Sequence, residues 1–153
     1  MQLQLPAAVQ EFRDANKNKV QGINLWPEED NIHQWSLQLE GPEDTVYRGG
    51  RFMVALKVPQ DYPLTPPTAT FRTRIFHPNI HFKTGEVCLD ILKSQWTPAW
   101  TLLSVAQAIM SMLSDYNADS PLNCDAGNLI RCHDLKGFNS VARMYAIEYA
   151  GAC

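Results

Sequence analysis

The first half of the chain alternates apolar and polar residues, which is the pattern of half-buried β-strands. Every second residue is apolar between 33 and 39, and the alternation returns between 52 and 58. Segments 21–26 and 68–72 predict two further strands. Only a few turn residues separate the four segments, so we expect an antiparallel meander. The apolar positions of the two clearest strands are Trp35, Leu37 and Leu39, then Phe52, Val54, Leu56 and Val58.

The second half of the chain changes to the spacing of amphipathic helices. Apolar residues recur at intervals of three and four over 102–113, and Thr101 is the expected N-cap of this helix. Ser120 and Pro121 form a cap and first-turn pair, which predicts another helix over 121–131.

Two more helices complete the expected order. Asp134 is expected to cap a last helix over 135–149, and a short helix over 7–17 follows Pro6. A helix, a four-stranded meander, an irregular segment and three helices predict a single α+β domain over 1–153, with the helices segregated from the sheet. The residues expected to face inward on the last helix are Leu135, Phe138, Val141, Ala142 and Tyr145.

Composition and charge narrow the function. The chain has 153 residues, 45% of them hydrophobic, which suits one globular domain with a sizeable core. Its 16 acidic and 13 basic residues give a net charge of -3, which argues against nonspecific binding to nucleic acid. No apolar run approaches the roughly 18 residues of a membrane span. Residues 1–6 lack the features of a signal peptide. We therefore expect an intracellular protein, or one attached to a membrane only through a partner.

The four cysteines show no Cys-x-x-Cys spacing, so we expect neither a structural zinc site nor any other metal. A disulfide framework is not expected either, because the chain has enough apolar residues for a core. Cys124 and Cys132 are expected to be packed or half-buried, and Cys153 to lie on a frayed end. Cys88 has more unusual neighbours.

Cys88 is the candidate nucleophile, because it follows the polar segment 77–79 and a short loop that contains a glycine. A thiol of ordinary pKa (about 8.5) is only a few per cent thiolate at pH 7, yet it is intrinsically nucleophilic. Asn79 can donate N–H bonds without titrating, which suits an oxyanion that forms near Cys88. The alternative is that Asn79 caps a turn and Cys88 is a packed small residue.

A cysteine hydrolase would need a histidine base beside the thiol. His77 and His81 are poor candidates, since both share the short loop of Cys88. His33 and His133 cannot be placed from the sequence.

Five motifs then occur in an order and spacing that cover most of the chain. They are Tyr62-Pro63-Leu64-Thr65-Pro66-Pro67, His77-Pro78-Asn79, Cys88-Leu89-Asp90-Ile91-Leu92, Ser94-Gln95-Trp96-Thr97-Pro98-Ala99 and Asp119-Ser120-Pro121-Leu122. Together they resemble the ubiquitin-conjugating enzyme family, from Trp35 to the last helix. Segments 84–89 and 126–132, and a loop from Asn79 to Cys88 one residue longer than in the commonest members, most resemble the peroxisomal member.

The resemblance implies a ubiquitin-conjugating fold and a role for each motif. Cys88 would accept ubiquitin from the activating enzyme as a thioester and pass it to a substrate cysteine or lysine. Asn79 would support the oxyanion or brace the loop that shapes it, and loss of a direct donor typically costs ~10²–10³ in rate. His77 is expected to be structural, with its ring bonded to backbone, and Trp96 to pack under the active segment, residues 77–92. No cofactor is expected, since ATP is used by the upstream activating enzyme.

The resemblance also implies two surfaces. The residues expected at the acceptor entrance are Asp90, Asn117, Asp119 and Ser120. The residues expected to meet RING-type ligases are Leu64, Pro66, Thr97, Pro98 and Ala99.

The likeness to the peroxisomal member implies partners and a location. It suggests peroxisomal RING ligases, and a membrane-anchored peroxin that holds the enzyme at the cytoplasmic face of the peroxisomal membrane. The expected substrate is the peroxisomal import receptor, whose recycling supports matrix protein import.

Two positions depart from the family pattern. Ser120 stands where many members have a second aspartate, although a lysine of pKa ~10.4 needs help to lose its proton. Our hypothesis is that Asp119 or Asp90 takes over part of this role, or that the acceptor is a less demanding cysteine. Ala7 and Gln10 stand where many members carry basic residues, so charging is expected to be slow without a helper. The nearest basic substitutes are Arg13 and Lys17.

Three other functions remain open at this point. The chain could conjugate another ubiquitin-like modifier, or be a non-catalytic ubiquitin-binding variant. Such variants usually lack the cysteine, whereas Cys88 is present. A cysteine hydrolase is the last alternative, because the sequence places no suitable histidine base beside Cys88.

Overall fold

The computed structural model describes residues 7–153, so Pro6 and the segment examined for a signal peptide lie outside the described residues. The elements are α1 Ala7–Lys17, β1 Ile23–Glu28, β2 Asn31–Glu40, β3 Arg51–Lys57, β4 Thr68–Phe71, the short 3₁₀ helix η1 Asp90–Leu92, α2 Leu102–Ser114, α3 Cys124–Arg131 and α4 Leu135–Ala150. This is the expected order, and the predicted α+β class is confirmed. None of the helices in this part of the chain is both long and apolar enough to cross a bilayer.

The sheet is the predicted antiparallel meander, in the order β1-β2-β3-β4. Leu37 lies opposite both Leu25 on β1 and Val54 on β3, so the apolar positions of neighbouring strands share one face. β1 begins two residues later than expected. The reason is that Gly22 adopts a left-handed conformation (φ 82°), which ends the preceding turn before the strand can start.

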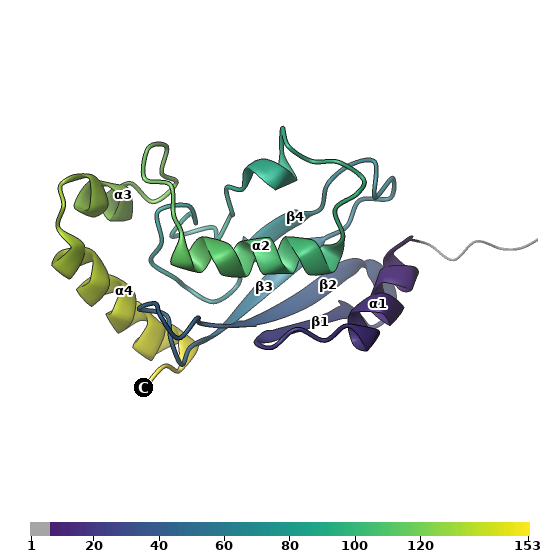
Figure 1. Cartoon of the computed structure of the whole chain (residues 1–153), viewed down its shortest axis with the longest axis horizontal. Helices are drawn as coiled ribbons and strands as arrows, with labels where there is room; N and C mark the ends of the chain where they lie inside the picture. The colour runs from purple at the N-terminus through teal and green to yellow at the C-terminus, as the bar shows by residue number, and fades with distance from the viewer. Residues whose placement is uncertain (1–6) are drawn as a thin grey trace, which may run out of the picture.

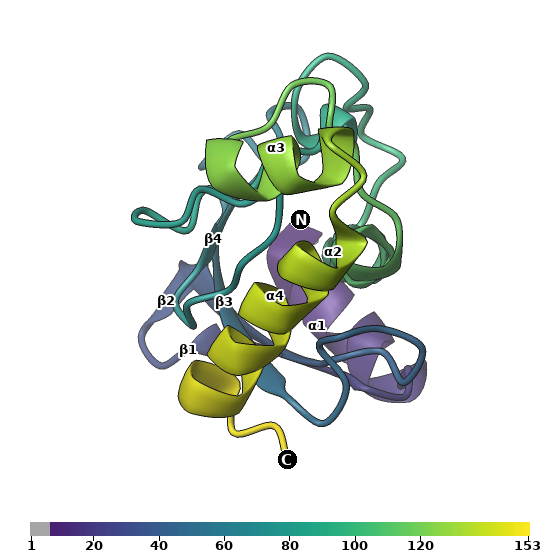
Figure 2. The ribbon, with the colours of Figure 1, turned by 90° about the vertical axis from the view of Figure 1, so that its left-hand side faces the viewer.

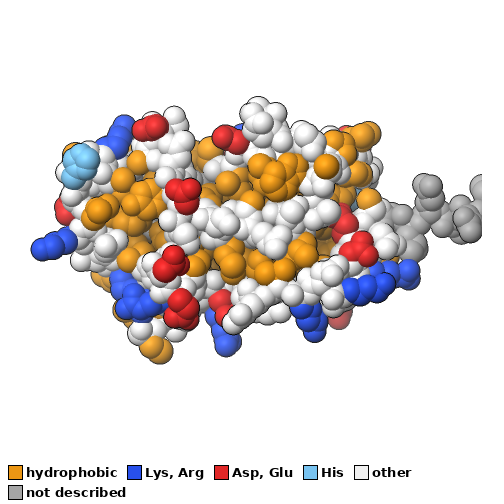
Figure 3. Space-filling model, in the orientation of Figure 1, with side chains coloured by type: hydrophobic (Ala, Val, Ile, Leu, Met, Phe, Trp, Pro, Cys, Tyr) orange, Lys and Arg blue, Asp and Glu red, His pale blue; other side chains and the backbone are white. Residues whose placement is uncertain are grey.

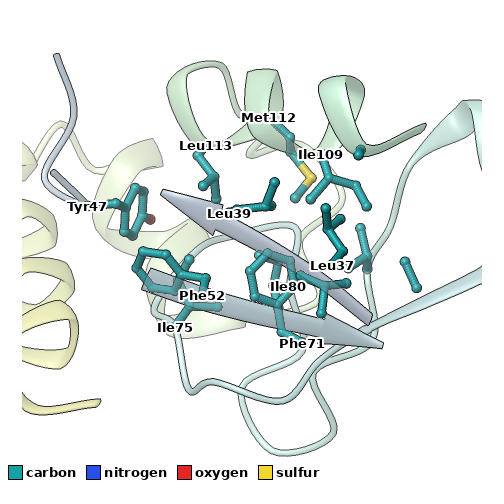
Figure 4. Packing of buried hydrophobic residues seen from close by; sticks show 14 of the residues in the cluster. Leu37, Leu39, Tyr47, Phe52, Phe71, Ile75, Ile80, Ile109, Met112 and Leu113 are labelled. Atoms are coloured by element: carbon teal, nitrogen blue, oxygen red, sulfur yellow. The ribbon is translucent and has the colours of Figure 1, made fainter. Parts of the chain in front are cut away.

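One helix covers the apolar face of the sheet. In Figure 1, α2 crosses this face, α1 lies at one end, and α3 and α4 lie at the other. Figure 2 shows α4 running along that end of the sheet, with α3 close to its start. The buried side of α2 points into the sheet, where Ile109 and Leu113 face Leu37 and Leu39 (Figure 4). The predicted cap of α2 is confirmed, because Thr101 accepts from the Ser104 N–H at 3.1 Å.

The start of α3 differs from the prediction. Pro121 lies before the helix, and Asn123 is the N-cap, accepting from the Ala126 N–H at 3.1 Å. The backbone N–H groups of Leu122 and Asn123 instead donate to the Pro78 carbonyl, at 2.8 and 3.1 Å. Residues 121–123 are therefore fastened to the candidate active segment instead of forming a first helical turn.

Three side chains are more exposed than expected. Leu135 is 50% exposed because it opens α4 at the helix end, whereas Phe138 and Ala142 are buried as predicted. Cys124 and Cys132 are exposed rather than packed, since they occupy the first position and the C-cap of the short helix α3. Cys153 is exposed, as expected.

A small hairpin continues from the sheet toward Cys88. Ile80 pairs with Val87, and Thr70 on β4 pairs with Glu86. The turn depends on Gly85, which has φ 77° and whose N–H donates to the His81 carbonyl at 2.8 Å. A Cβ atom there would lie 2.0 Å from the Phe71 carbonyl oxygen. The edge of the sheet therefore fixes the position of the cysteine.

We predict that Gly85→Ala lowers the free energy of unfolding by at least about 2 kcal/mol, because strain and a backbone clash act together. Gly151→Ala is the matched control. Gly151 also has positive φ (71°), but a Cβ there would meet no atom within 4 Å. Urea unfolding of both variants measures the difference, and equal losses would contradict a role for the Phe71 contact.

Candidate active site

Cys88 lies in a groove of about 400 Å³ between the active segment and α2. Its lining residues are Asn79, Cys88, Leu89, Asp90, Ala108, Ser111, Met112, Asp115, Asn117 and Ser120. Larger hollows of about 550 and 490 Å³ lie elsewhere in the described part of the chain, and neither is lined by a cysteine. The groove is therefore the site with a nucleophile.

The backbone of Cys88 is held by its neighbour across the hairpin. Its N–H donates to the Asn79 carbonyl at 2.9 Å, and its side chain is partly exposed. The chain then turns into η1, where Asp90 is exposed. A partly exposed thiol in an open groove is accessible to another large molecule.

The buried carboxamide of Asn79 forms a two-point pair with the backbone of Asn117. Its Nδ2 donates to the Asn117 carbonyl at 2.7 Å, and its Oδ1 accepts from the Asn117 N–H at 2.9 Å. This pairing braces the loop after α2 against the active segment. Because a carboxamide nitrogen carries two N–H groups, one donor of Asn79 is not used in this pair.

His77 joins the same segment to α2. Its Nε2 lies 2.7 Å from the Met112 carbonyl, and its Nδ1 accepts from the Asn79 N–H at 3.0 Å. The proton of the neutral ring therefore lies on Nε2. Burial lowers the pKa of His77 to about 4, and the bond to Met112 opposes this only in part. A neutral ring with both nitrogens bonded to backbone is suited to positioning and not to proton transfer.

Residues 7–153 place no histidine in the lining of the groove. His81 is also bonded within its own loop, where Nδ1 accepts from the N–H groups of Lys83 and Thr84 at 3.2 and 3.1 Å. Nor does this range contain a cluster of three or more His, Cys, Asp or Glu side chains that could hold a metal ion. The geometry therefore does not favour a cysteine hydrolase with a histidine base.

The structure brings together three of the four residues expected at the acceptor entrance. Asp90, Asn117 and Ser120 line the groove, whereas Asp119 does not, and its N–H donates to the Asn117 Oδ1 at 2.9 Å. Sequence reasoning missed Asp115, which lines the groove from the C-terminal end of α2. The available signal was its spacing from Ala108, Ser111 and Met112, since these positions share one helical face.

The two loops expected to meet ligases are joined by Trp96. Its Nε1 donates to the Pro63 carbonyl at 3.0 Å, and its ring lies 6.0 Å from that of Tyr62. These contacts place the indole between the two loops. Leu64 is 74% exposed beside this contact. The other residues of this surface are the partly buried Pro66 and the exposed Thr97, Pro98 and Ala99.

The exposed face of α1 has the composition that the sequence indicated. Ala7, Gln10, Arg13 and Lys17 are all exposed. On the other side of the helix, Glu11 accepts from the Tyr62 hydroxyl and from the Leu102 N–H, both at 2.8 Å. Burial raises the pKa of Glu11. α1 is thus connected to the loop that contains Tyr62 and to the start of α2.

We predict that His77 makes the stability of the protein depend on pH. Its pKa rises from about 4 in the folded chain to 6.5 in the unfolded chain, so between these values only the unfolded state gains the proton. The contribution of neutral His77 to the free energy of unfolding is therefore complete above pH 6.5, and it falls by about 3 kcal/mol on acidification to pH 4.

Urea unfolding from pH 7 to 4 measures this dependence. His77→Gln is expected to flatten it, whereas the control His133→Gln, at an exposed histidine, is expected to keep it. If the two variants had the same slope, the assignment to His77 would be wrong. The His77 ring signals of the folded wild type, followed by NMR, give the midpoint directly.

Comparison with known proteins agrees with this geometry. The family model described as ubiquitin-conjugating enzyme matches residues 7–146. The chain is 50% identical to Protein PEROXIN-4 of Arabidopsis thaliana over 147 residues, covering 95% of this chain and 94% of that protein. It is also 50% identical to the ubiquitin-conjugating enzyme E2 pex4 of Dictyostelium discoideum over 142 residues, covering 92% and 95%.

Solved structures give the same result. The crystal structure of the H. polymorpha ubiquitin-conjugating enzyme Pex4p, in complex with the soluble domain of Pex22p, superposes with a TM-score of 0.89 at 31% identity. The match covers 94% of this chain and 96% of that one. The likeness therefore extends over the sheet, the active segment and the helices. The chain belongs to the ubiquitin-conjugating enzyme family and is a ubiquitin transferase.

Proposed function

We propose that this enzyme carries ubiquitin as a thioester on Cys88 at the peroxisomal membrane and transfers it to the peroxisomal import receptor. The observation that carries the proposal is the partly exposed Cys88 in an open groove beside Asn79, with no histidine in the lining formed by residues 7–153. The 50% identity to peroxin-4 proteins supports the peroxisomal role. Ligases of the RING type would dock on the loops joined by Trp96, where Leu64 is exposed.

The chemistry needs no base to activate Cys88 for transfer, because the thioester is already an activated acyl group. An acceptor amine or thiol attacks the carbonyl carbon of the thioester, and a new C–N or C–S bond forms to this carbon. The bond from this carbon to the Cys88 sulfur breaks, Cys88 leaves as a thiolate, and the proton of the acceptor passes to solvent. We assign the second N–H of the Asn79 carboxamide to the oxyanion that forms in this step. The enzyme uses no cofactor of its own in this proposal, since ATP is consumed by the activating enzyme.

We predict that incubation with ubiquitin, activating enzyme and ATP gives a band heavier by one ubiquitin on a non-reducing gel. Reductant should abolish this band, and Cys88→Ala should prevent its formation. Cys132→Ala is the matched control, because Cys132 is an exposed thiol outside the groove. A band that persists in Cys88→Ala would refute the proposal. The same assay with another ubiquitin-like modifier and its activating enzyme tests the alternative modifier.

We also propose that a membrane-anchored partner holds this enzyme at the peroxisome and promotes its charging. The H. polymorpha relative was solved with the soluble domain of Pex22p, which supports such a partner. The exposed face of α1 supports the need for it, since Ala7 and Gln10 add no positive charge there. A weaker positive field slows the association with an acidic surface.

We predict that charging in a single-turnover assay rises about 5-fold or more when the soluble domain of a Pex22p-like partner is added. The double variant Ala7→Lys, Gln10→Lys should charge faster than the wild type without the partner, and gain less from it. Equal charging rates of the wild type with and without the partner would count against this proposal.

A further inference from the structure

We propose that Asp115 is the residue that favours lysine over cysteine as the acceptor of ubiquitin in this enzyme. The inference rests on the proposed function, because it concerns the transfer that follows charging of Cys88. Ser120 supplies a hydroxyl where many members of the family have an acid, so an acceptor ammonium in this groove would be bound by another carboxylate. Of the two aspartates among the lining residues, Asp90 lies on the cysteine side and Asp115 on the helix side.

Asp115 lies at the end of the α2 face that lines the groove. Ala108, Ser111, Met112 and Asp115 line it at intervals of three and four, which is the spacing of a single helical face. Asp115 is the C-cap of this helix, and its N–H donates to the Ser111 carbonyl at 3.0 Å. The backbone is therefore fixed by the helix end, while the exposed carboxylate remains available to an acceptor.

The end of α2 strengthens the negative field at this point. A helix C-terminus carries partial negative charge, and a carboxylate there is unfavourable for the stability of the helix. The last turn of α2 has no basic residue to offset it. Within residues 7–153, the lining of the groove has no Lys or Arg either. Figure 3 shows basic side chains toward the outline of this face and several acidic ones inside it. An unfavourable charge in this position suggests a role in binding a cation.

This field discriminates between the two acceptors. A lysine arrives as an ammonium, which Asp115 attracts and orients, and one proton leaves to solvent before the neutral amine attacks. The C–N bond forms as the C–S bond breaks, Cys88 leaves as a thiolate, and the second proton of the nitrogen passes to solvent. A cysteine acceptor attacks as a thiolate, which the same carboxylate repels.

The test measures discharge of the Cys88 thioester to Nα-acetyl-lysine amide and to N-acetyl-cysteine amide, which differ in their side chains. We expect Asp115→Asn to slow discharge to the lysine compound about 5-fold at low acceptor concentration. The half-saturating concentration should rise while the maximal rate changes little. Discharge to the cysteine compound should become about 2-fold faster. Asp115→Glu should retain most of the preference of the wild type.

Two further variants separate this role from a general loss of charge. Asp125→Asn, at an exposed acid of α3 outside the groove, should behave as the wild type. Asp119→Asn should change the ratio of the two discharge rates less than Asp115→Asn does. An equal or larger effect of Asp119→Asn would overturn the proposal, as would an Asp115→Asn variant that slows both acceptors by the same factor.

The wild type supplies a test that requires no variant. Discharge to the lysine compound should fall more steeply with added salt than discharge to the cysteine compound, because salt screens exposed charges. Equal salt dependences would overturn the assignment. Charging is measured first in every case. If no Cys88 thioester forms, the proposed function itself fails. If the thioester forms but Asp115→Asn leaves the ratio of the two discharge rates unchanged, this inference alone is refuted.

Discussion

The candidate active site depends on the two hydrogen bonds between the buried His77 ring and the backbone. The ring ties the Met112 carbonyl of α2 to the Asn79 N–H of the active segment. The Asn79 side chain then forms two hydrogen bonds with the backbone of Asn117, and the Asn79 backbone carbonyl accepts the N–H of Cys88. Helix, hairpin and following loop are therefore joined by one continuous set of hydrogen bonds. A protonated ring would turn Nδ1 into a donor facing another N–H, so this arrangement requires the neutral form.

The same segment also organises the C-terminal helices. The Pro78 carbonyl accepts two N–H groups from the residues that precede α3, which is why this helix begins at Cys124. The aromatic rings of Tyr47 and Tyr116 lie 6.1 Å from the His77 ring. A short polar motif thus joins α2, the segment of Cys88 and the residues before α3 through hydrogen bonds to backbone.

The sequence predicted those parts of the fold that depend on local periodicity. Strands β2 and β3 and helices α2 and α4 were recognisable because their apolar residues repeat at intervals set by strand and helix geometry. The start of α3 was not recognisable, because the two residues just before it donate to the Pro78 carbonyl, more than 40 positions earlier in the chain. The exposure of Leu135 likewise depends on which elements surround the helix end.

The candidate site was predictable for a different reason. Cys88 and Asn79 were found from the chemistry of their side chains, and the motifs around them from resemblance. Asp115 was missed because an acid at a helix end, beside serines, is typical of a solvated surface. Only the three-dimensional groove distinguishes it from Asp119.

Polar side chains hold both ends of α2, Glu11 from a half-buried position and His77 from a buried one. At its start, the Leu102 N–H donates to Glu11 of α1, the helix expected to meet the activating enzyme. Near its end, the Met112 carbonyl bonds to His77, and Asp115 lines the groove. Its 13 residues span about 20 Å between these points. One helix therefore holds the exposed face of α1 and the groove of Cys88 at a fixed separation.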